Sequence, residues 1–223
     1  MIDYDGLQIS WTGHDGYRIV GTDDNNRKRT IYIDPFQLSG AHKNKNDADL
    51  VLISHNHYDH LSIDDLKKVV SKETAVVAAQ ECVAQLRQLE VKESRGVRPG
   101  DKLKISDVGL EIVSAYNTNK QFHPKADGKV GFVFTISGRR IYHTGDTDVI
   151  PEMRSLSPDI AFVPVSGTYV MTADEAAQAV NEFIRPKELV IPMHYGAIVG
   201  SEKDAENFRK LVTICETKIL KKE

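Results

Sequence analysis

The stretch "VLISHNHYDH", from Val51 to His60, decides how the 223-residue chain is interpreted. Its start belongs to the apolar run "LVLIS" (50–54), which is typical of a strand buried on both faces. The six residues that follow contain three histidines and an aspartate. Polar side chains at the end of a buried strand need partners or water, and packing alone gives no reason for HxHxDH. The pattern therefore predicts several lone pairs that meet at one ligand.

Three other polar residues also follow predicted strands. His123 comes after "LEIVSA" by a loop, Asp146 after "RIYH", and His194 after "LVIP". Sheets bind ligands at the carboxyl ends of their strands, because loops from several strands converge there. A lone histidine in such a place is more often structural, but a cluster from four segments is not expected by chance. The candidate ligands are His55, His57, Asp59, His60, His123, Asp146 and His194.

Composition excludes several classes of protein. A hydrophobic content of 40% with 27% charged residues is ordinary for a globular chain, and the length favours one domain, residues 1–223. Twenty-nine basic against 32 acidic residues leave a net charge of -3, so no basic field favours nucleic acid or an anionic membrane. Cys82 and Cys215 lie far apart and predict neither a disulfide nor a thiolate site. No signal peptide or membrane span is recognisable, so a cytoplasmic protein is expected.

The hydrophobic pattern predicts a β-rich opening and then alternating strands and helices in each half of the chain. We expect strands at 7–11, 17–20, 30–33, 50–54, 75–79, 103–105, 110–115, 131–136, 140–143, 160–165 and 189–195. Helices are expected at 62–70, 80–89, 172–184 and 201–212. Ser62 and a Thr172 to Glu175 capping box begin two of these helices. No internal sequence repeat is detectable, and the pattern predicts sheets in the middle with helices outside.

The segments "WTGHDGYRI", "HNHYDH", "HTGDT" and "PMHYG", in this order, resemble the metallo-β-lactamase superfamily. More specifically, they are similar to its branch of ascorbate-6-phosphate-lactonase-like metal-dependent hydrolases. The form "HNHYDH" also resembles N-acylphosphatidylethanolamine phospholipase D. The likeness covers nearly the whole chain and implies a single-domain, four-layer αββα sandwich of the α/β class. It also implies two metal ions at one edge of the stacked sheets.

The resemblance further implies how the ligands divide between the two metals. His55, His57 and His123 would hold the first ion, Asp59, His60 and His194 the second, and Asp146 would bridge them. His123 rests on order and loop position, because "NKQFHPK" departs from the usual short His-Ser context. Its competitor is His143, which stands inside a predicted strand and is interpreted as structural. Zinc is the favoured metal, with manganese or iron as alternatives, because the ligands are imidazoles and carboxylates without thiolates.

Two such ions would lower the pKa of a shared water and generate a hydroxide that attacks a carbonyl or phosphoryl centre. Asp59 is a catalytic candidate because it can orient that water or accept its proton. His14 is the other, as a proton donor to a leaving group or a contact for an anionic substrate. The alternative for His14 is a buried histidine bonded to backbone. Lys120 and Lys125 could clamp a phosphate or carboxylate, although lysines in polar loops are usually solvated.

The sequence thus predicts a metal-dependent hydrolase of a small ester, lactone or phosphodiester. The alternatives are a phospholipase-D-like phosphodiesterase and a non-enzymatic metal-binding protein on the same fold. Oxygen chemistry is disfavoured, because flavodiiron relatives have a carboxylate in the first motif where His57 stands here. A small-molecule substrate is the expected partner, and a homo-oligomer stays open because relatives often assemble.

Overall fold

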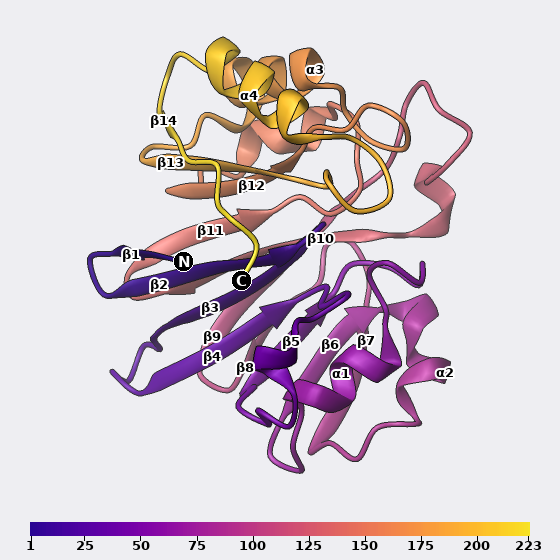
Figure 1. The fold of residues 1–223 in the computed structure, drawn as a ribbon. Helices are drawn as coiled ribbons and strands as arrows, with labels where there is room; N and C mark the ends of the chain where they lie inside the picture. The colour runs from indigo at the N-terminus through magenta and orange to yellow at the C-terminus, as the bar shows by residue number, and fades with distance from the viewer.

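The apolar runs form two seven-stranded sheets, which the computed structural model describes over residues 1–223 (Figure 1). In spatial and chain order, the first sheet is β1 (Ile2–Tyr4), β2 (Leu7–Gly13), β3 (Gly16–Thr22), β4 (Lys28–Ile33), β5 (Leu50–Ile53), β6 (Ala75–Ala79) and β7 (Glu93–Val97). The second sheet is β8 (Lys102–Ile105), β9 (Val108–Ser114), β10 (Val130–Ile136), β11 (Arg139–His143), β12 (Ile160–Pro164), β13 (Leu189–Met193) and β14 (Glu216–Thr217).

The two halves of the chain have the same topology. In the first sheet β1 to β4 are antiparallel and β4 to β7 are parallel. In the second, β8 to β11 are antiparallel and β11 to β14 are parallel. Each strand of the first half therefore has a counterpart in the second, although no sequence repeat was detectable. Loops that follow matching strands, such as β2 and β9, occupy equivalent places in the two sheets.

Helices cover the outer faces of the sheets. Figure 1 shows α1 (Ile63–Val69) and α2 (Val83–Leu86) on one outer side, with α3 (Ala173–Gln178) and α4 (Glu202–Leu211) on the opposite one. Ser62 accepts a hydrogen bond from the backbone N–H of Asp65, and Thr172 with Glu175 forms the predicted capping box. The remaining helical turns are Gly40–His42, Gln80–Cys82, Lys125–Asp127, Pro151–Ser155 and the π-helical Ala179–Ile184. The predicted single-domain αββα sandwich is confirmed.

The expected elements differ from the observed ones in a few places. The helix predicted at 80–89 is broken into a 3₁₀ turn at Gln80–Cys82 and the short α2. The strands β1, β7 and β14 were not predicted. The first four residues of β7, "ESRG", contain no apolar side chain, so the sequence gives no strand signal there. No helix is long and apolar enough to cross a bilayer.

A core cluster of 61 buried residues draws on both sheets and holds the strand ends in place. Tyr17 of β3 stacks on Phe162 of β12, with ring centroids 4.1 Å apart, and so joins the two sheets. The only tryptophan, Trp11, is buried and stacks on Tyr195 at 4.8 Å. These contacts lie next to the strand ends that carry the predicted ligands. The site is therefore built on rigid elements.

Candidate metal centre

The first predicted group of ligands comes together around His57. His55 and His57 follow β5, and His123 comes from the loop between β9 and β10. His57 Nδ1 lies 3.0 Å from His55 Nε2 and 3.2 Å from His123 Nε2. Two nitrogens bound tetrahedrally to one zinc ion, each at its usual bond length, lie roughly 3.4 Å apart. The three nitrogens are therefore spaced as ligands of a single ion.

The second predicted group lies beside the first. Ligand atoms of Asp59, His60 and His194 fall within 4.8 Å of one another, and His14 offers a fourth such atom. Asp59 Oδ2 is 3.0 Å from His14 Nε2 and 3.7 Å from His60 Nε2. His194 reaches this place from the end of β13, in the second sheet. The group therefore combines residues from both halves of the chain.

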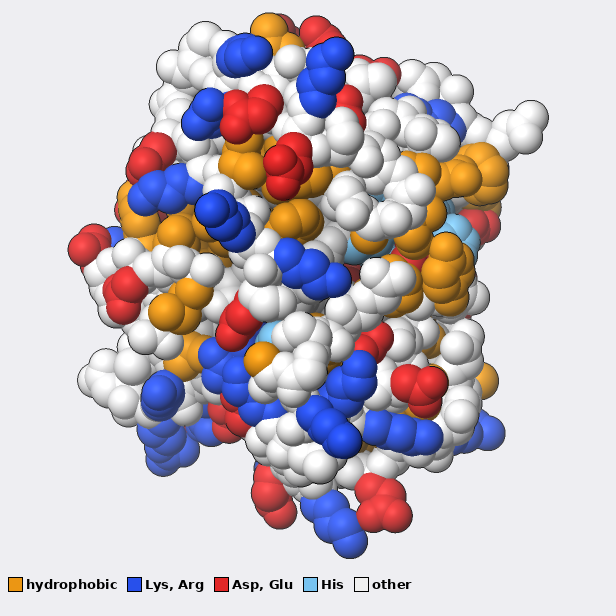
Figure 2. Space-filling view, viewed as in Figure 1, with side chains coloured by type: hydrophobic (Ala, Val, Ile, Leu, Met, Phe, Trp, Pro, Cys, Tyr) orange, Lys and Arg blue, Asp and Glu red, His pale blue; other side chains and the backbone are white.

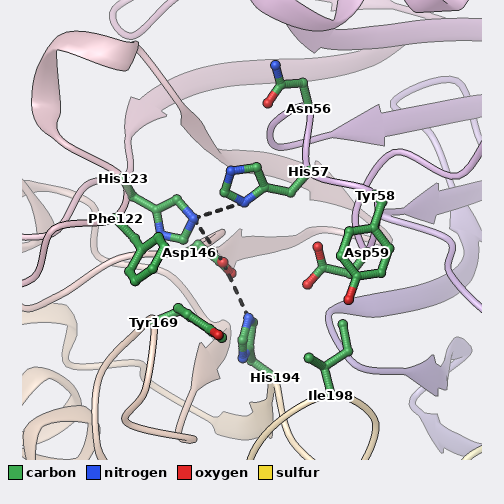
Figure 3. Close-up of a pocket in the computed structure, with 10 residues that line it drawn as sticks. All are labelled: Asn56, His57, Tyr58, Asp59, Phe122, His123, Asp146, Tyr169, His194 and Ile198. Carbon is green, nitrogen blue, oxygen red and sulfur yellow. Dashed lines mark hydrogen bonds and ion pairs between the residues drawn. The ribbon is translucent and has the colours of Figure 1, made fainter.

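Asp146 lies between the two groups (Figure 3). Its Oδ2 is 3.5 Å from His123 Nε2 and 3.3 Å from His194 Nε2. Its Oδ1 is 3.5 Å from His60 Nε2. The carboxylate follows β11 and is buried. It therefore faces both groups at once, and the structure brings all seven predicted ligands together.

The unsatisfied polar atoms at the centre fit a bound cation. His60 Nε2 and Asp146 Oδ1 are buried and have no hydrogen-bond partner in the protein. Buried polar atoms without partners are rare and costly, and a metal ion between them would satisfy both. All the facing donors are nitrogen or oxygen, which suits zinc, manganese or iron.

Outer residues fix the orientation of two of the rings. His60 Nδ1 lies 2.8 Å from Asp34 Oδ2, and Asp34 Oδ1 accepts a hydrogen bond of 2.8 Å from the Ser54 backbone N–H. His194 Nδ1 lies 2.9 Å from Ser166 Oγ. Such partners hold a histidine in the tautomer and direction that a metal needs. Both rings therefore present Nε2 to the centre.

Sequence reasoning missed Asp34 and Asp15. Asp34 directly follows β4, so the strand-end rule that selected Asp146 after β11 would also have found it. Asp15 is fully buried, both its carboxylate oxygens lack a hydrogen-bond partner, and one lies 3.8 Å from His60 Nδ1. Its signal was a charged residue in "GHDG", directly beside the candidate His14. Both carboxylates lie close to His60.

Several site residues have a left-handed backbone. The φ angles are 54° at His14, 40° at Asp34, 56° at His123 and 59° at His194. Positive φ is uncommon outside glycine and costs of order 1 kcal/mol or more for each residue. His14 and His123 lie in equivalent loops, after β2 and β9, and Asp34 and Asp146 follow the equivalent strands β4 and β11. The fold maintains this strain where the side chains must converge.

Burial and neighbouring charges separate the pKa values of the histidines. Burial lowers the pKa of His123 to about 4 and that of His55 well below its usual range. Burial also opposes the charged form of His194, but Asp146 and Asp15 outweigh it and raise the pKa to about 9. Burial acts against His60 in the same way, yet the charge of Asp146 raises its pKa too. Without metal, the first group is neutral while His60 and His194 hold protons.

The other candidate residues of the sequence analysis do not line the pocket. His14 is buried behind Asp59 and does not line the pocket. His143 Nε2 lies 3.0 Å from the Asp15 carbonyl, and its Nδ1 accepts from the Gly145 backbone N–H, so both nitrogens contact backbone. Lys120 pairs with Asp148, and Lys125 pairs with Glu152 at 2.8 Å. Neither lysine lines the pocket.

The centre forms the floor of a pocket of about 440 Å³ (Figure 3). Residues from five loops line it: Asn56, His57, Tyr58, Asp59, Phe122, His123, Asp146, Tyr169, His194 and Ile198. The volume is in the range of pockets that enclose a small molecule. Five of the seven predicted ligands, all but His55 and His60, thus face a space that a substrate can enter.

Comparison with known proteins agrees with this geometry. A sequence profile described as the β-lactamase superfamily domain matches residues 8–194. A UPF0173 metal-dependent hydrolase of Staphylococcus aureus is 28% identical to this chain, over 96% of this chain and 97% of its own length. Another, of Thermoplasma acidophilum, is 29% identical, over 97% of this chain and 95% of its own length. A solved structure from Parabacteroides distasonis, described as a candidate metal-dependent hydrolase, is 31% identical with a TM-score of 0.78, covering 96% of this chain and 94% of that one. The chain belongs to the metallo-β-lactamase superfamily.

Proposed function

We propose that this metal-dependent hydrolase binds two divalent cations, with zinc as the favoured metal, and cleaves a small ester, lactone or phosphodiester. The observation that supports it is the position of Asp146, whose carboxylate lies between two groups of ligand atoms at the floor of a pocket. One ion would take His55, His57 and His123, and the other Asp59, His60 and His194. The resemblance to lactonase-like hydrolases supports the lactone among these substrates.

A bound pair of divalent cations supplies Lewis acidity, which lowers the pKa of a shared water and stabilises the negative charge that develops on the carbonyl or phosphoryl oxygen. The chain's own residues position the reactants. His55 and His123 are neutral at pH 7 and so offer lone pairs. Asp34 and Ser166 keep the rings of His60 and His194 directed inward. The pocket walls limit the directions from which the substrate can approach.

Asp59 is suited to hold the attacking water. It lines the pocket, and its side chain is partly accessible. Burial opposes its ionisation, but the hydrogen bond from His14 and the charge of His60 outweigh this and lower its pKa to about 2. Asp59 is therefore a carboxylate at neutral pH and can accept a hydrogen bond from water. We assign His14 to hold Asp59 in place, because its buried ring does not face the substrate.

Elemental analysis of gently purified protein, followed by a substrate screen with and without chelator, tests this function. We expect bound zinc, manganese or iron, and turnover of at least one ester, lactone or phosphodiester that chelator abolishes and metal restores. Asp146→Ala should lose both metal and turnover. The control Asp127→Ala, at an exposed carboxylate outside the pocket, should keep both.

The alternatives predict other results from the same screen. A clear preference for phosphodiesters over carboxylic esters would favour the phospholipase-D-like activity. Tight metal binding with no turnover of any substrate class would favour a non-enzymatic metal-binding protein. Turnover that survives complete removal of metal would contradict the proposal.

A further inference from the structure

The pocket has an apolar rim above its polar floor. Tyr58, Phe122 and Ile198 are 67%, 49% and 38% exposed, and they are three of the six exposed large hydrophobic side chains in the protein. Phe122 packs edge-on against Tyr169, with ring centroids 4.8 Å apart. Figure 2 shows pale-blue histidine atoms between orange hydrophobic side chains on the right of the view. An apolar patch that borders a site of chemistry indicates a ligand with apolar surface.

No lysine or arginine lines the pocket. The three lysines nearest to His123 in sequence each pair with a carboxylate. The pairs are Lys120 with Asp148, Lys125 with Glu152 and Lys129 with Glu81. Lys120 and Lys129 are also largely buried. None of these cations is therefore placed to bind an anionic group of a substrate.

The metal ions do not replace the missing cation. Bound ions would hold their positive charge at the floor, beside the attacking water and the carbonyl oxygen that gains charge. A second anionic group, farther along the substrate, would meet the rings of Tyr58, Phe122 and Tyr169 and the side chain of Ile198. An anion that leaves water for such surroundings without a counter-charge is strongly disfavoured. The rim therefore favours an uncharged substituent.

We propose that the substrate is an uncharged ester or lactone whose acyl or aryl group packs against Tyr58, Phe122, Tyr169 and Ile198. This inference rests on the proposed hydrolase function and specifies its substrate class. In the reaction, the oxygen of water bonds to the acyl carbon, the ester C–O bond breaks, and the alcohol leaves with a proton that originates from the water. The apolar rim disfavours a substrate that carries a phosphate or carboxylate there.

Hydrolysis of three p-nitrophenyl esters by the zinc-loaded protein tests the substrate class. The esters are the acetate, the hexanoate and the adipate monoester, which ends in a carboxylate. Each buried methylene group contributes about a three- to fourfold gain. We expect kcat/KM for the hexanoate to exceed the values for the acetate and the adipate monoester at least about tenfold. A preference for the adipate monoester, or equal rates on all three, would overturn the inference.

Alanine variants of two rim residues test whether their side chains bind the acyl group. Phe122→Ala and Ile198→Ala should each lower the hexanoate-to-acetate ratio of kcat/KM about fivefold, mainly through a higher KM for the hexanoate. Leu211→Ala is the matched control, because Leu211 is a similarly exposed apolar residue on α4 outside the pocket. Metal content, measured on each variant, shows whether Phe122→Ala has displaced the neighbouring His123. An unchanged ratio in Ile198→Ala and in a metal-replete Phe122→Ala would contradict the assignment.

A binding measurement separates this inference from the hydrolase function. Hexananilide and adipic acid monoanilide, whose amide bonds are far less reactive, are titrated calorimetrically into zinc-loaded and into metal-free protein. We expect hexananilide to bind at least about tenfold more tightly in both forms. This result without turnover of any ester would refute hydrolysis but keep the apolar subsite. Chelator-sensitive turnover, with equal or no binding of the two anilides, would refute the subsite and keep hydrolysis.

Discussion

His14 Nε2 lies 3.0 Å from Asp59 Oδ2, and the two residues come from different loops of the first sheet. Burial lowers the pKa of His14 to about 4, so at neutral pH the ring is neutral and its Nε2–H donates to the carboxylate. His14 follows β2 as His123 follows β9 in the matching sheet. The two equivalent loops therefore serve opposite sides of the centre. One carries His123, a proposed ligand, and the other carries His14, which contacts the proposed ligand Asp59.

Replacement of His14 tests this relationship. We expect His14→Ala to weaken binding of the second zinc ion about 10- to 100-fold, because Asp59 loses the group that orients it. His14→Gln keeps an N–H donor and should recover much of the loss. A competition titration with a chromophoric chelator measures both sites. His42→Ala removes another buried histidine, which belongs to none of the groups of possible ligands, and is the control. Equal zinc affinities in wild type and His14→Ala would contradict the role.

Zinc binding should release protons to an extent that falls as the pH rises. The pKa of His194 is raised to about 9 and that of His60 is also raised, so at pH 7 both hold protons that the metal must displace. Above pH 9 the proton on His194 is already lost, and the release from it disappears. Calorimetry in buffers of different ionisation enthalpy counts the protons. We expect at least about one proton at pH 7 and fewer at pH 9.5. A release that grows with pH would instead indicate ionisation of water.

Asp34→Ala should destabilise the metal-free protein. The carboxylate holds the Ser54 N–H and His60 Nδ1, both buried. Its removal leaves the Ser54 N–H without a partner and leaves His60 Nδ1 only the longer contact of 3.3 Å to Ser54 Oγ. Loss of one member of a buried charged pair costs roughly 3–5 kcal/mol. Urea unfolding after treatment with chelator measures the change. Glu90→Ala is the control, since Glu90 pairs with Lys72 in full contact with solvent and should cost less than about 1 kcal/mol. Similar losses in both variants would refute the role of Asp34.

Asp148 anchors the loop that carries His123. Its Oδ2 accepts hydrogen bonds from the backbone N–H groups of Thr118 and Asn119, and its Oδ1 pairs with Lys120. We expect Asp148→Ala to weaken the first zinc site about tenfold while the second keeps its affinity, because only His123 depends on this loop. Cobalt substitution with absorption spectroscopy follows the two sites. An equal loss at both sites would show general unfolding instead of a local effect.

The sequence predicted the parts of the fold that have strong local signals. Runs such as 131–136 and 160–165 are apolar enough to be recognised as strands, and β10 and β12 lie there. The strand β7 begins with four non-apolar residues and exists through pairing with β6, which local pattern cannot reveal. The helix expected at 80–89 is broken after one turn. The superfamily and the hydrolase class were also predicted correctly.

The sequence predicted the ligand residues of the candidate site but not the residues that hold them in place. Strand-end position selected Asp146 and His194, and the structure brings them within 3.3 Å. Asp34 also follows a predicted strand, yet it was not among the predicted site residues. The partner of His14 could not be predicted, because Asp59 is 45 residues away and the contact depends on a left-handed backbone at His14. The matching topology of the two halves appears in the hydrophobic pattern, which is β-rich and then alternating in each half, but not as a sequence repeat.

Anomalous diffraction at the zinc edge, from crystals of zinc-loaded protein, tests the central proposal most directly. We predict two anomalous peaks for each chain. One should lie among His55, His57 and His123, the other among Asp59, His60 and His194, and Asp146 should contact both. A single peak, or peaks that do not share Asp146, would contradict the proposed two-metal centre.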